Sequence, residues 1–172
     1  MPGPRFHEKP SFRATPRAHP MPMSLTLRTA TLEDADAISQ LVVGLAHHFL
    51  EGADAAEVQP FLATLTPAAT AQRIASPDFR HDVAEDDTGI CGVIALRGGS
   101  HVYHLFVREN QHRRGIARAL WEHAKALSGH DTFTVRSSLY AEPVYAQWGF
   151  VREAPPRTDN GVTWVAMHLV GG

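Results

Sequence analysis

The spacing of apolar residues predicts an ordered series of helices and strands along this chain. Leu25 to Arg28 alternates apolar and polar positions, as a short strand does. Thr31 with Asp34 three residues later is typical of a helix start. The apolar positions that follow recur with a period of about 3.6 residues, and Gly52 is the expected end of that helix. Its buried face comprises Ile38, Leu41, Val42, Leu45 and Phe49.

A strand meander is expected after a broken helical region. Residues 54–76 read as short helical pieces, because Pro60 and Pro67 interrupt the backbone hydrogen bonds. Three apolar runs separated by polar or glycine turns then predict consecutive antiparallel strands. These strands cover residues 81–85, 90–97 and 101–107.

The second half of the chain alternates helices with strands. A helix is expected from Ile116 to Gly129, with a buried stripe formed by Ala119, Leu120, Ala124 and Leu127. A strand at 132–137, a short helix at 141–148 and a closing hairpin through Asn160-Gly161 complete the pattern. We therefore predict a single α/β domain with a mixed, mostly antiparallel central sheet and helices on both faces.

Composition and charge narrow the class of protein and of partner. The chain has 172 residues, of which 44% are apolar and 20% charged, which is enough for one domain with a real core. A net charge of −2 argues against nucleic acid, and no apolar run is long enough to span a membrane. The single cysteine, Cys91, cannot form an internal disulfide, so we expect a reducing, cytoplasmic location and a core role for this residue.

The first 23 residues differ in character from the remainder. They contain six prolines and three arginines and lack the continuous apolar region of a signal peptide. We expect residues 1–23 to be a disordered Pro/Arg-rich tail and residues 24–170 to form the domain. Translation from Met23 is an alternative explanation of the tail.

A basic turn between residues 107 and 116 predicts an anion site. The strand through Val107 leads into a turn that contains Arg113, Arg114 and Gly115, and a helix opens directly at Ile116. Amides at a helix start lack intrahelical acceptors and lie at the positive end of the helix dipole, so a phosphate can bind there. A solvated helix start is the alternative. The turn matches neither a P-loop nor a Gly-x-Gly-x-x-Gly loop.

Two motifs, taken together, resemble the GNAT acyltransferase superfamily. The family's loop Gln/Arg-x-x-Gly-x-Gly/Ala is similar to residues 112–117, with His112 standing where Gln or Arg is usual. The family's later signature, Asn/Ser-x-x-Ala-x-x-Phe/Val-Tyr-x-x-x-Gly-Phe, is matched after a short strand. The matching residues are Ser138, Ala141, Val144, Tyr145, Gly149 and Phe150. The resemblance covers about residues 24–170.

The resemblance implies acetyl-CoA as the acyl donor and requires no metal. In this family the strand before the loop diverges from its neighbour. The last residues of that strand contact the pantetheine arm and the thioester of the acyl donor. Backbone amides of the loop bind its diphosphate. The implied CoA-binding residues here are Phe106, Val107, His112, Arg113, Arg114, Gly115, Ile116, Ala117 and Ser138. The resemblance also assigns Tyr145 as the general acid for the CoA sulfur, with a buried core role as the alternative for this residue. Tyr140, at the start of the same helix, is the second candidate for the acid.

A base is needed because an alkyl amine, with a pKa of about 10, is protonated at neutral pH. Strict strand alternation would place His101, Tyr103 and Leu105 on one face and Val102, His104 and Phe106 on the other. The resemblance implies a base near the start of this strand. We therefore expect His101 to act through water, with His104 as the alternative.

These features together imply an N-acetyltransferase that uses direct attack on the thioester, without a covalent intermediate. A non-catalytic acyl-CoA sensor of the same fold is the alternative. The acceptor would be the amine of a small molecule or peptide, bound between residues 35–75 and the final hairpin; a homodimer is possible. Candidates for its apolar lining, or for core, are Phe49, Phe61, Trp148 and Trp164.

No spacing of His, Cys or Asp indicates a metal site. His47 and His48 are adjacent on an expected helix, so their side chains should diverge by about 100° and lie at the surface or core edge. Glu109 is expected to shape the basic turn.

Overall fold

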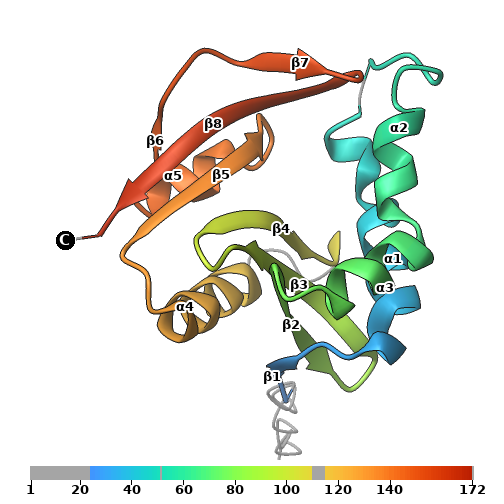
Figure 1. Cartoon of the computed structure of the whole chain (residues 1–172), viewed down its shortest axis with the longest axis vertical. Coiled ribbons are helices and arrows are strands. Elements are labelled where there is room, and N and C mark those ends of the chain that lie inside the picture. Colours follow the sequence, from blue (N-terminus) through green and yellow to red (C-terminus); the bar gives the residue numbers. More distant parts are fainter. Residues whose placement is uncertain (1–23, 51, 110–114, 172) are drawn as a thin grey trace, which may run out of the picture.

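The computed structural model describes residues 24–50, 52–109 and 115–171, and the predicted tail, residues 1–23, lies outside them. The described strands form one eight-stranded sheet in the order β1-β2-β3-β4-β5-β8-β6, with β7 paired to β8 (Figure 1). The strands are β1 (Thr26–Thr29), β2 (Phe79–Asp86), β3 (Gly89–Arg97), β4 (His101–Val107), β5 (Thr132–Ser138), β6 (Val151–Arg152), β7 (Arg157–Asp159) and β8 (Val162–Val170).

Helices cover both faces of the sheet, as the sequence predicted. The α-helices are α1 (Ala35–Gly44), α2 (Gln59–Leu62), α3 (Pro67–Ala75), α4 (Ile116–Ser128) and α5 (Glu142–Gln147). Three short 3₁₀ turns are η1 (Leu32–Asp34), η2 (Ala46–His48) and η3 (Ala63–Leu65). Figure 1 shows α4 and the α1–α3 group on opposite sides of β2, β3 and β4. None of the helices in the described ranges is both long and apolar enough to cross a bilayer.

Each face has its own hydrophobic core. The core under α4 and α5, called the α4 core below, is built around Leu120, Trp121, Phe133, Val135, Tyr145 and Met167. The core under α1 and α3, called the α1 core, is built around Ile38, Val42, Leu65, Val83 and Val93. Fully burying side chains of this size stabilises the fold by about 1.5–3 kcal/mol each. The fold class therefore agrees with the prediction.

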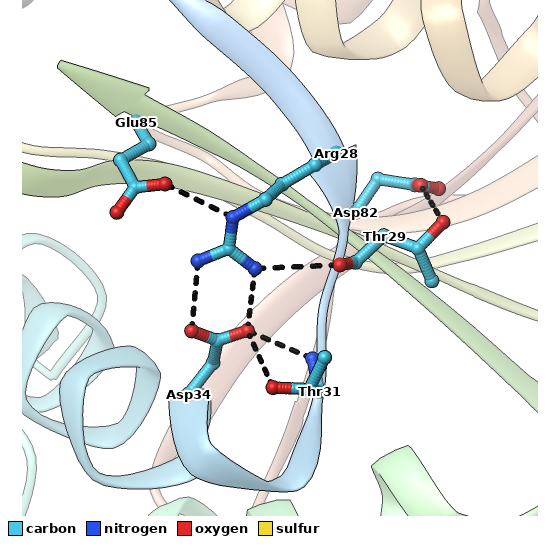
Figure 2. A network of polar contacts seen from close by, with 6 residues as sticks. All are labelled: Arg28, Thr29, Thr31, Asp34, Asp82 and Glu85. Carbon is cyan, nitrogen blue, oxygen red and sulfur yellow. Dashed lines mark hydrogen bonds and ion pairs between the residues drawn. The ribbon is translucent and has the colours of Figure 1, made fainter.

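The start of α1 is fixed by a charged network that Figure 2 shows from close by. The two terminal nitrogens of Arg28 donate to the two carboxylate oxygens of Asp34, at 2.8 and 2.9 Å, and its Nε donates to Glu85 at 2.9 Å. Asp34 also accepts from the Thr31 backbone N–H at 2.8 Å. Paired charges of this kind lower the pKa of Asp34. The predicted helix start is confirmed.

The predicted end of that helix is wrong. The α-helix ends at Gly44, and the chain continues as the 3₁₀ turn η2 rather than running on to Gly52. The backbone hydrogen bonds tighten there, since Leu45 N–H donates to Val42 O and His48 N–H donates to Leu45 O, both at 3.1 Å. Gly44, where the α-helix ends, has a lower helix propensity than the residues before it.

The buried stripe of α4 is displaced from the predicted one. Leu127 is 53% exposed, whereas Trp121 is buried and stacks on Trp148 with the two rings 6.0 Å apart. Helix α4 lies close to the sheet because Gly92 has no side chain. A methyl group at Gly92 would come within 2.9 Å of Leu120 Cδ1 and 3.3 Å of Ile116 Cγ2. This close approach places the N-terminus of α4 directly against β3.

Strands β4 and β5 separate after a short contact, as the family resemblance implied. They form the parallel pair of the described sheet, and their pairing is limited to His101 with Thr134 and Val102 with Val135. Both strands then continue for several residues without pairing to each other. In Figure 1 the half of the sheet with β5 and β8 leans away from β4. The divergence opens a gap in the middle of the sheet.

A bulge in β4 overturns the predicted alternation of its side chains. The β3 pairing shifts between Ala95, opposite His104, and Leu96, opposite Val102, so that Tyr103 is an extra residue. Tyr103 and His104 therefore lie on one face, with ring centroids 4.5 Å apart. Beyond the bulge the faces exchange: Phe106 packs on the α1 core, while Leu105, Val102 and Val107 pack on the α4 core.

Candidate active site

A cavity of about 360 Å³ lies where β4 and β5 diverge. Its walls come from β4, β5 and α5, from the segment between α1 and α3, and from the β7–β8 hairpin. The cavity lies in the region between residues 35–75 and that hairpin, where the acceptor was expected to bind. Phe49 and Phe61 from the first region and Trp164 from the second line it.

The tip of the β7–β8 hairpin closes one end of the cavity. A methyl group added to Gly161 would lie 2.9 Å from Val58 Cγ1 and 3.3 Å from Ala53 Cβ, so this turn is in tight contact with the chain before α2. Figure 1 shows the same approach of the hairpin to the α2 end of the molecule. The contact joins the β7–β8 hairpin to the segment before α2.

Tyr145 borders the cavity from α5. The residue is buried, and its ring meets Trp148 and Phe150 edge to face at 5.7 and 5.4 Å between centroids. Burial raises the pKa of its hydroxyl above the ordinary value of 10, so this group keeps its proton at neutral pH.

His101 borders the same cavity from the start of β4. Its Nδ1 lies 2.8 Å from Thr134 Oγ1 on β5. Burial, followed by the nearby guanidinium groups of Arg97 and Arg136, lowers the pKa of His101 to about 4. The imidazole is therefore neutral at pH 7 and has a lone pair with which to accept a proton.

His104 also reaches the cavity, on the same face as His101 because of the bulge. Its ring lies between those of Tyr103 and Phe106, at 4.5 and 5.2 Å between centroids. Burial and the positive charge of Arg73 lower the pKa of His104 to about 3. The two candidate bases thus differ in exposure, with His101 the more accessible.

The CoA-binding residues implied by the resemblance lie in three parts of the molecule. The first part is the cavity together with the end of β4. Phe106 and Ser138 line the cavity, and Ser138 Oγ accepts a hydrogen bond from Ala141 N–H at 3.1 Å. Val107 is buried against the α4 core and pairs with Gly92.

The start of α4 forms the second part. Gly115 adopts a left-handed conformation, with φ +76°, and precedes the helix without a side-chain cap. The carbonyl of Gly115 accepts a hydrogen bond from Ala119 N–H at 2.9 Å, so the amides of Ile116 and Ala117 precede this bond and lack an acceptor within the helix.

The third part lies outside the described residues. His112, Arg113 and Arg114 belong to it, and their contribution to phosphate binding stays a prediction.

His47 and His48 do not diverge as expected. They lie in the 3₁₀ turn η2, with ring centroids 4.0 Å apart, and both face Glu109. Their Nε2 atoms are 3.7 and 3.4 Å from Glu109 Oε1. These three residues form a group whose ligand atoms lie within 4.8 Å of one another and could hold a metal ion. This group could not be predicted from the sequence, because Glu109 is far from His47 and His48 along the chain and only the fold brings the three residues together.

Sequence reasoning also missed several polar residues of the cavity. Arg97, Arg136 and Asp159 line it, although none belongs to a recognised motif. The alternation of side chains along a strand would have indicated Arg136, because it is two residues from Thr134 and lies on the same face. Trp148, by contrast, belongs to the core, where it stacks on Trp121.

Comparison with known families agrees with this architecture. Residues 49–170 match the family described as acetyltransferase (GNAT) domain. The chain belongs to the GNAT acetyltransferase family. No curated protein sequence matches it.

Solved GNAT structures share the fold. A GCN5-related N-acetyltransferase from Rhodopseudomonas palustris is 23% identical, with a TM-score of 0.70, over 87% of this chain and 98% of that one. The PaiA N-acetyltransferase of Thermoplasma acidophilum, solved in complex with coenzyme A, is 15% identical, with a TM-score of 0.73, over 86% and 99% of the two chains. A spermidine N-acetyltransferase from Vibrio cholerae is 17% identical, with a TM-score of 0.59, over 85% and 93%.

Proposed function

We propose that this GNAT domain transfers an acetyl group from acetyl-CoA to an amine of a small molecule or peptide. The observation that carries the proposal is the cavity at the divergence of β4 and β5, which Tyr145 and His101 both border. A proton donor and a proton acceptor then flank the place where a thioester entering between the strands would meet an amine. Family membership supports the acyltransferase chemistry.

Acetyl-CoA would lie along the open edge of β4. The described pairing of β4 with β5 ends at Val102, so we propose that the backbone near Phe106 binds the pantetheine arm and the thioester carbonyl, with Val107 assigned on the family resemblance. Ser138 borders this path on the β5 side. The CoA complex of the Thermoplasma protein, which has the same fold, supports CoA binding as the role of this gap.

The diphosphate of CoA would bind at the start of α4. The amides at Gly115, Ile116 and Ala117 supply donors and the positive end of the helix dipole. His112, Arg113 and Arg114 are proposed to complete this site. No metal is needed for the chemistry.

Each step of the transfer has a residue suited to it. His101, neutral at pH 7, takes a proton from the ammonium group through a water molecule. The free amine attacks the thioester carbonyl carbon, the new C–N bond forms, and the C–S bond breaks as the intermediate collapses. Tyr145, which keeps its proton, donates it to the departing CoA sulfur; the attacking nitrogen loses its extra proton to solvent, and solvent returns a proton to the Tyr145 oxygen. His104 is the alternative base on the same face.

Direct attack is favoured over a covalent acyl-enzyme because the cysteine is unsuitable. Cys91 is completely buried in β3, and burial raises the pKa of its thiol. It offers no thiolate to attack a thioester. A buried unpaired thiol also supports our proposal of a reducing, cytoplasmic location. We also propose that the protein forms a homodimer and has no nucleic-acid or membrane partner.

Release of free thiol from acetyl-CoA with a panel of amines tests this function. We expect amine-dependent release that is abolished when acetyl-CoA is replaced by a non-hydrolysable thioether analogue. If the folded protein binds acetyl-CoA but no amine accelerates thiol release, the catalytic proposal fails and an acyl-CoA sensor is the correct reading.

A further inference from the structure

The acceptor side of the cavity carries an excess of positive charge. Its charged lining residues within the described part of the chain are Arg97, Arg136 and a single carboxylate, Asp159. Asp159 already accepts a hydrogen bond from Trp164 Nε1–H at 3.1 Å, because both belong to the β7–β8 hairpin. The carboxylate therefore has a structural partner that is not an arginine.

Neither cavity arginine forms an ion pair with a described carboxylate. Other arginines of the chain do: Arg28 pairs with Asp34 at 2.8 Å, and Arg80 with Asp82 at 2.9 Å. Both cavity arginines are exposed where they line the cavity, so their N–H donors reach solvent and can bind an incoming acceptor group.

Aromatic rings hold these guanidinium groups in place instead. The Cζ of Arg136 lies 4.6 Å from the centre of the Trp164 ring, and Arg157 from β7 lies 5.8 Å from the same ring. The Cζ of Arg97 lies 6.0 Å from the centre of the Tyr103 ring. Stacking of this kind orients a guanidinium without using its N–H donors, which stay available to a planar oxyanion.

The two arginines flank the proposed base. Arg97 is directly opposite His101 in the β3–β4 pairing. Arg136 lies two residues beyond Thr134, whose hydroxyl is bonded to His101. An anion held by both guanidinium groups would therefore lie beside the position where the amine loses its proton.

We infer that the acceptor amine also carries an oxyanion, a carboxylate or a phosphate, which Arg97 and Arg136 bind. This inference rests on the proposed acetyltransferase function. Phe49 and Phe61, whose ring centroids are 5.5 Å apart, line the cavity as an apolar surface. A free amino acid with an apolar side chain satisfies the charge and the apolar wall together, whereas a polyamine would be repelled by the unpaired cations.

Matched acceptors test the charge preference. Rates of thiol release are measured with phenylalanine, phenylalaninamide and phenethylamine, with phosphoethanolamine against ethanolamine, and with spermidine. We expect kcat/KM for one oxyanion-bearing amine to exceed that of its neutral counterpart by about tenfold or more, since charge-assisted hydrogen bonds are worth at least that ratio. The phenylalanine and phosphate arms identify which oxyanion is preferred. Equal use of the neutral amines, or preference for spermidine, overturns the inference.

Arginine variants locate the preference in the cavity. R97Q and R136Q should each reduce the acid-to-amide ratio about fivefold or more, mainly through KM of the acceptor, and leave KM for acetyl-CoA unchanged. K125Q, at the far end of α4, removes the same charge outside the cavity and should leave the ratio unchanged. Unchanged ratios in both arginine variants contradict the assignment.

A binding measurement separates this inference from the proposed function. N-acetylphenylalanine, N-acetylphenylalaninamide and N-acetylphosphoethanolamine are titrated calorimetrically into the protein saturated with CoA, which requires no turnover. Tighter binding of one of the two anions than of the neutral amide supports the oxyanion site even if every amine fails to release thiol. Equal affinity overturns the site even if acetyl transfer is observed.

Discussion

The Nδ1 atom of His101 lies 2.8 Å from the Oγ1 atom of Thr134, across the parallel contact between β4 and β5. If Nδ1 carries the proton and donates it to the threonine hydroxyl, the lone pair at Nε2 is left to accept a proton. The contact occurs at the first of the two positions where the strands are paired, directly before they diverge. The same backbone register therefore orients the proposed base and opens the gap beside it.

Replacement of His101 by alanine should lower kcat/KM most at neutral pH, where the acceptor amine is mainly protonated. Because the pKa of His101 is lowered to about 4, the wild-type rate should show no histidine titration between pH 6 and 8. The rate should instead rise with pH as the amine deprotonates. We expect a loss of about 10²-fold at pH 7 that shrinks towards pH 9.

Thr134→Val is the matched variant, since it removes the hydroxyl partner and keeps the imidazole. It should reduce the rate less than His101→Ala does, over the same pH range. A pH profile of His101→Ala that parallels the wild type would remove His101 from the mechanism.

Replacement of Tyr145 by phenylalanine should reduce kcat by about 10²-fold, because the departing CoA thiolate loses its proton donor. The ring contacts with Trp148 and Phe150 are retained, so the melting temperature and the affinity for CoA should change little. Tyr140→Phe, at an exposed position, serves as the control and should keep full activity. Turnover of Tyr145→Phe near that of the wild type at saturating acetyl-CoA would show that another group protonates the sulfur.

Stability should fall as the pH is lowered from about 6.5 towards 4. His104 is buried in neutral form with its pKa lowered to about 3, so in this window the unfolded chain binds a proton that the folded chain does not. The free energy of unfolding should decrease by up to about 1.4 kcal/mol per pH unit from this residue. His81 and His101, whose pKa values are each lowered to about 4, add to the slope.

Urea unfolding at pH 7 and pH 5 measures this effect. His104→Gln should flatten the dependence, whereas replacing the exposed His130 by glutamine should leave it unchanged. Equal stability of the wild type at the two pH values would contradict the burial of neutral histidine.

Gly92→Ala should destabilise the fold by about 1–3 kcal/mol, because the new methyl group meets Leu120 and Ile116 at the start of α4. Gly44→Ala is the control: it adds the same methyl group to the end of α1, where nothing lies within 4 Å. It should raise stability by about 0.5–1 kcal/mol. Thermal unfolding of both variants provides the comparison, and a neutral Gly92→Ala would show that α4 can shift freely.

The sequence predicts local features of the fold better than it predicts contacts across the sheet. The capped start of α1 and the order of strands could be read from spacing, since each depends on neighbouring residues. The bulge at Tyr103 could not be predicted in this way. One extra residue does not change the composition of the strand noticeably, and yet it exchanges the two faces of β4. Arg97 and Arg136 were missed for a related reason, since only strand register brings them to His101.

The meeting of His47 and His48 with Glu109 was also beyond sequence reasoning. Adjacent positions diverge by about 100° in an α-helix and by about 120° in a 3₁₀ turn, so residue spacing gives no sign that both rings turn towards the carboxylate of Glu109.

Two charge-reversal variants in α4 distinguish an effect on CoA affinity from an effect on helix stability. Arg118 is exposed in the first turn, where Arg118→Glu favours the helix dipole but repels a diphosphate. We expect unchanged thermal stability and CoA affinity at least about tenfold weaker. Lys125→Glu, in the last turn, loses the 3.2 Å ion pair with Glu122 and should lose some stability while keeping full affinity. The opposite pattern would exclude the start of α4 as the phosphate site.

Calorimetric titration of CoA into the folded wild-type protein tests whether this domain binds the proposed acyl donor. We expect saturable heat with one CoA bound per chain, weakened by Arg118→Glu. Absence of any binding heat over a range of temperatures, with protein shown to be folded, would contradict it.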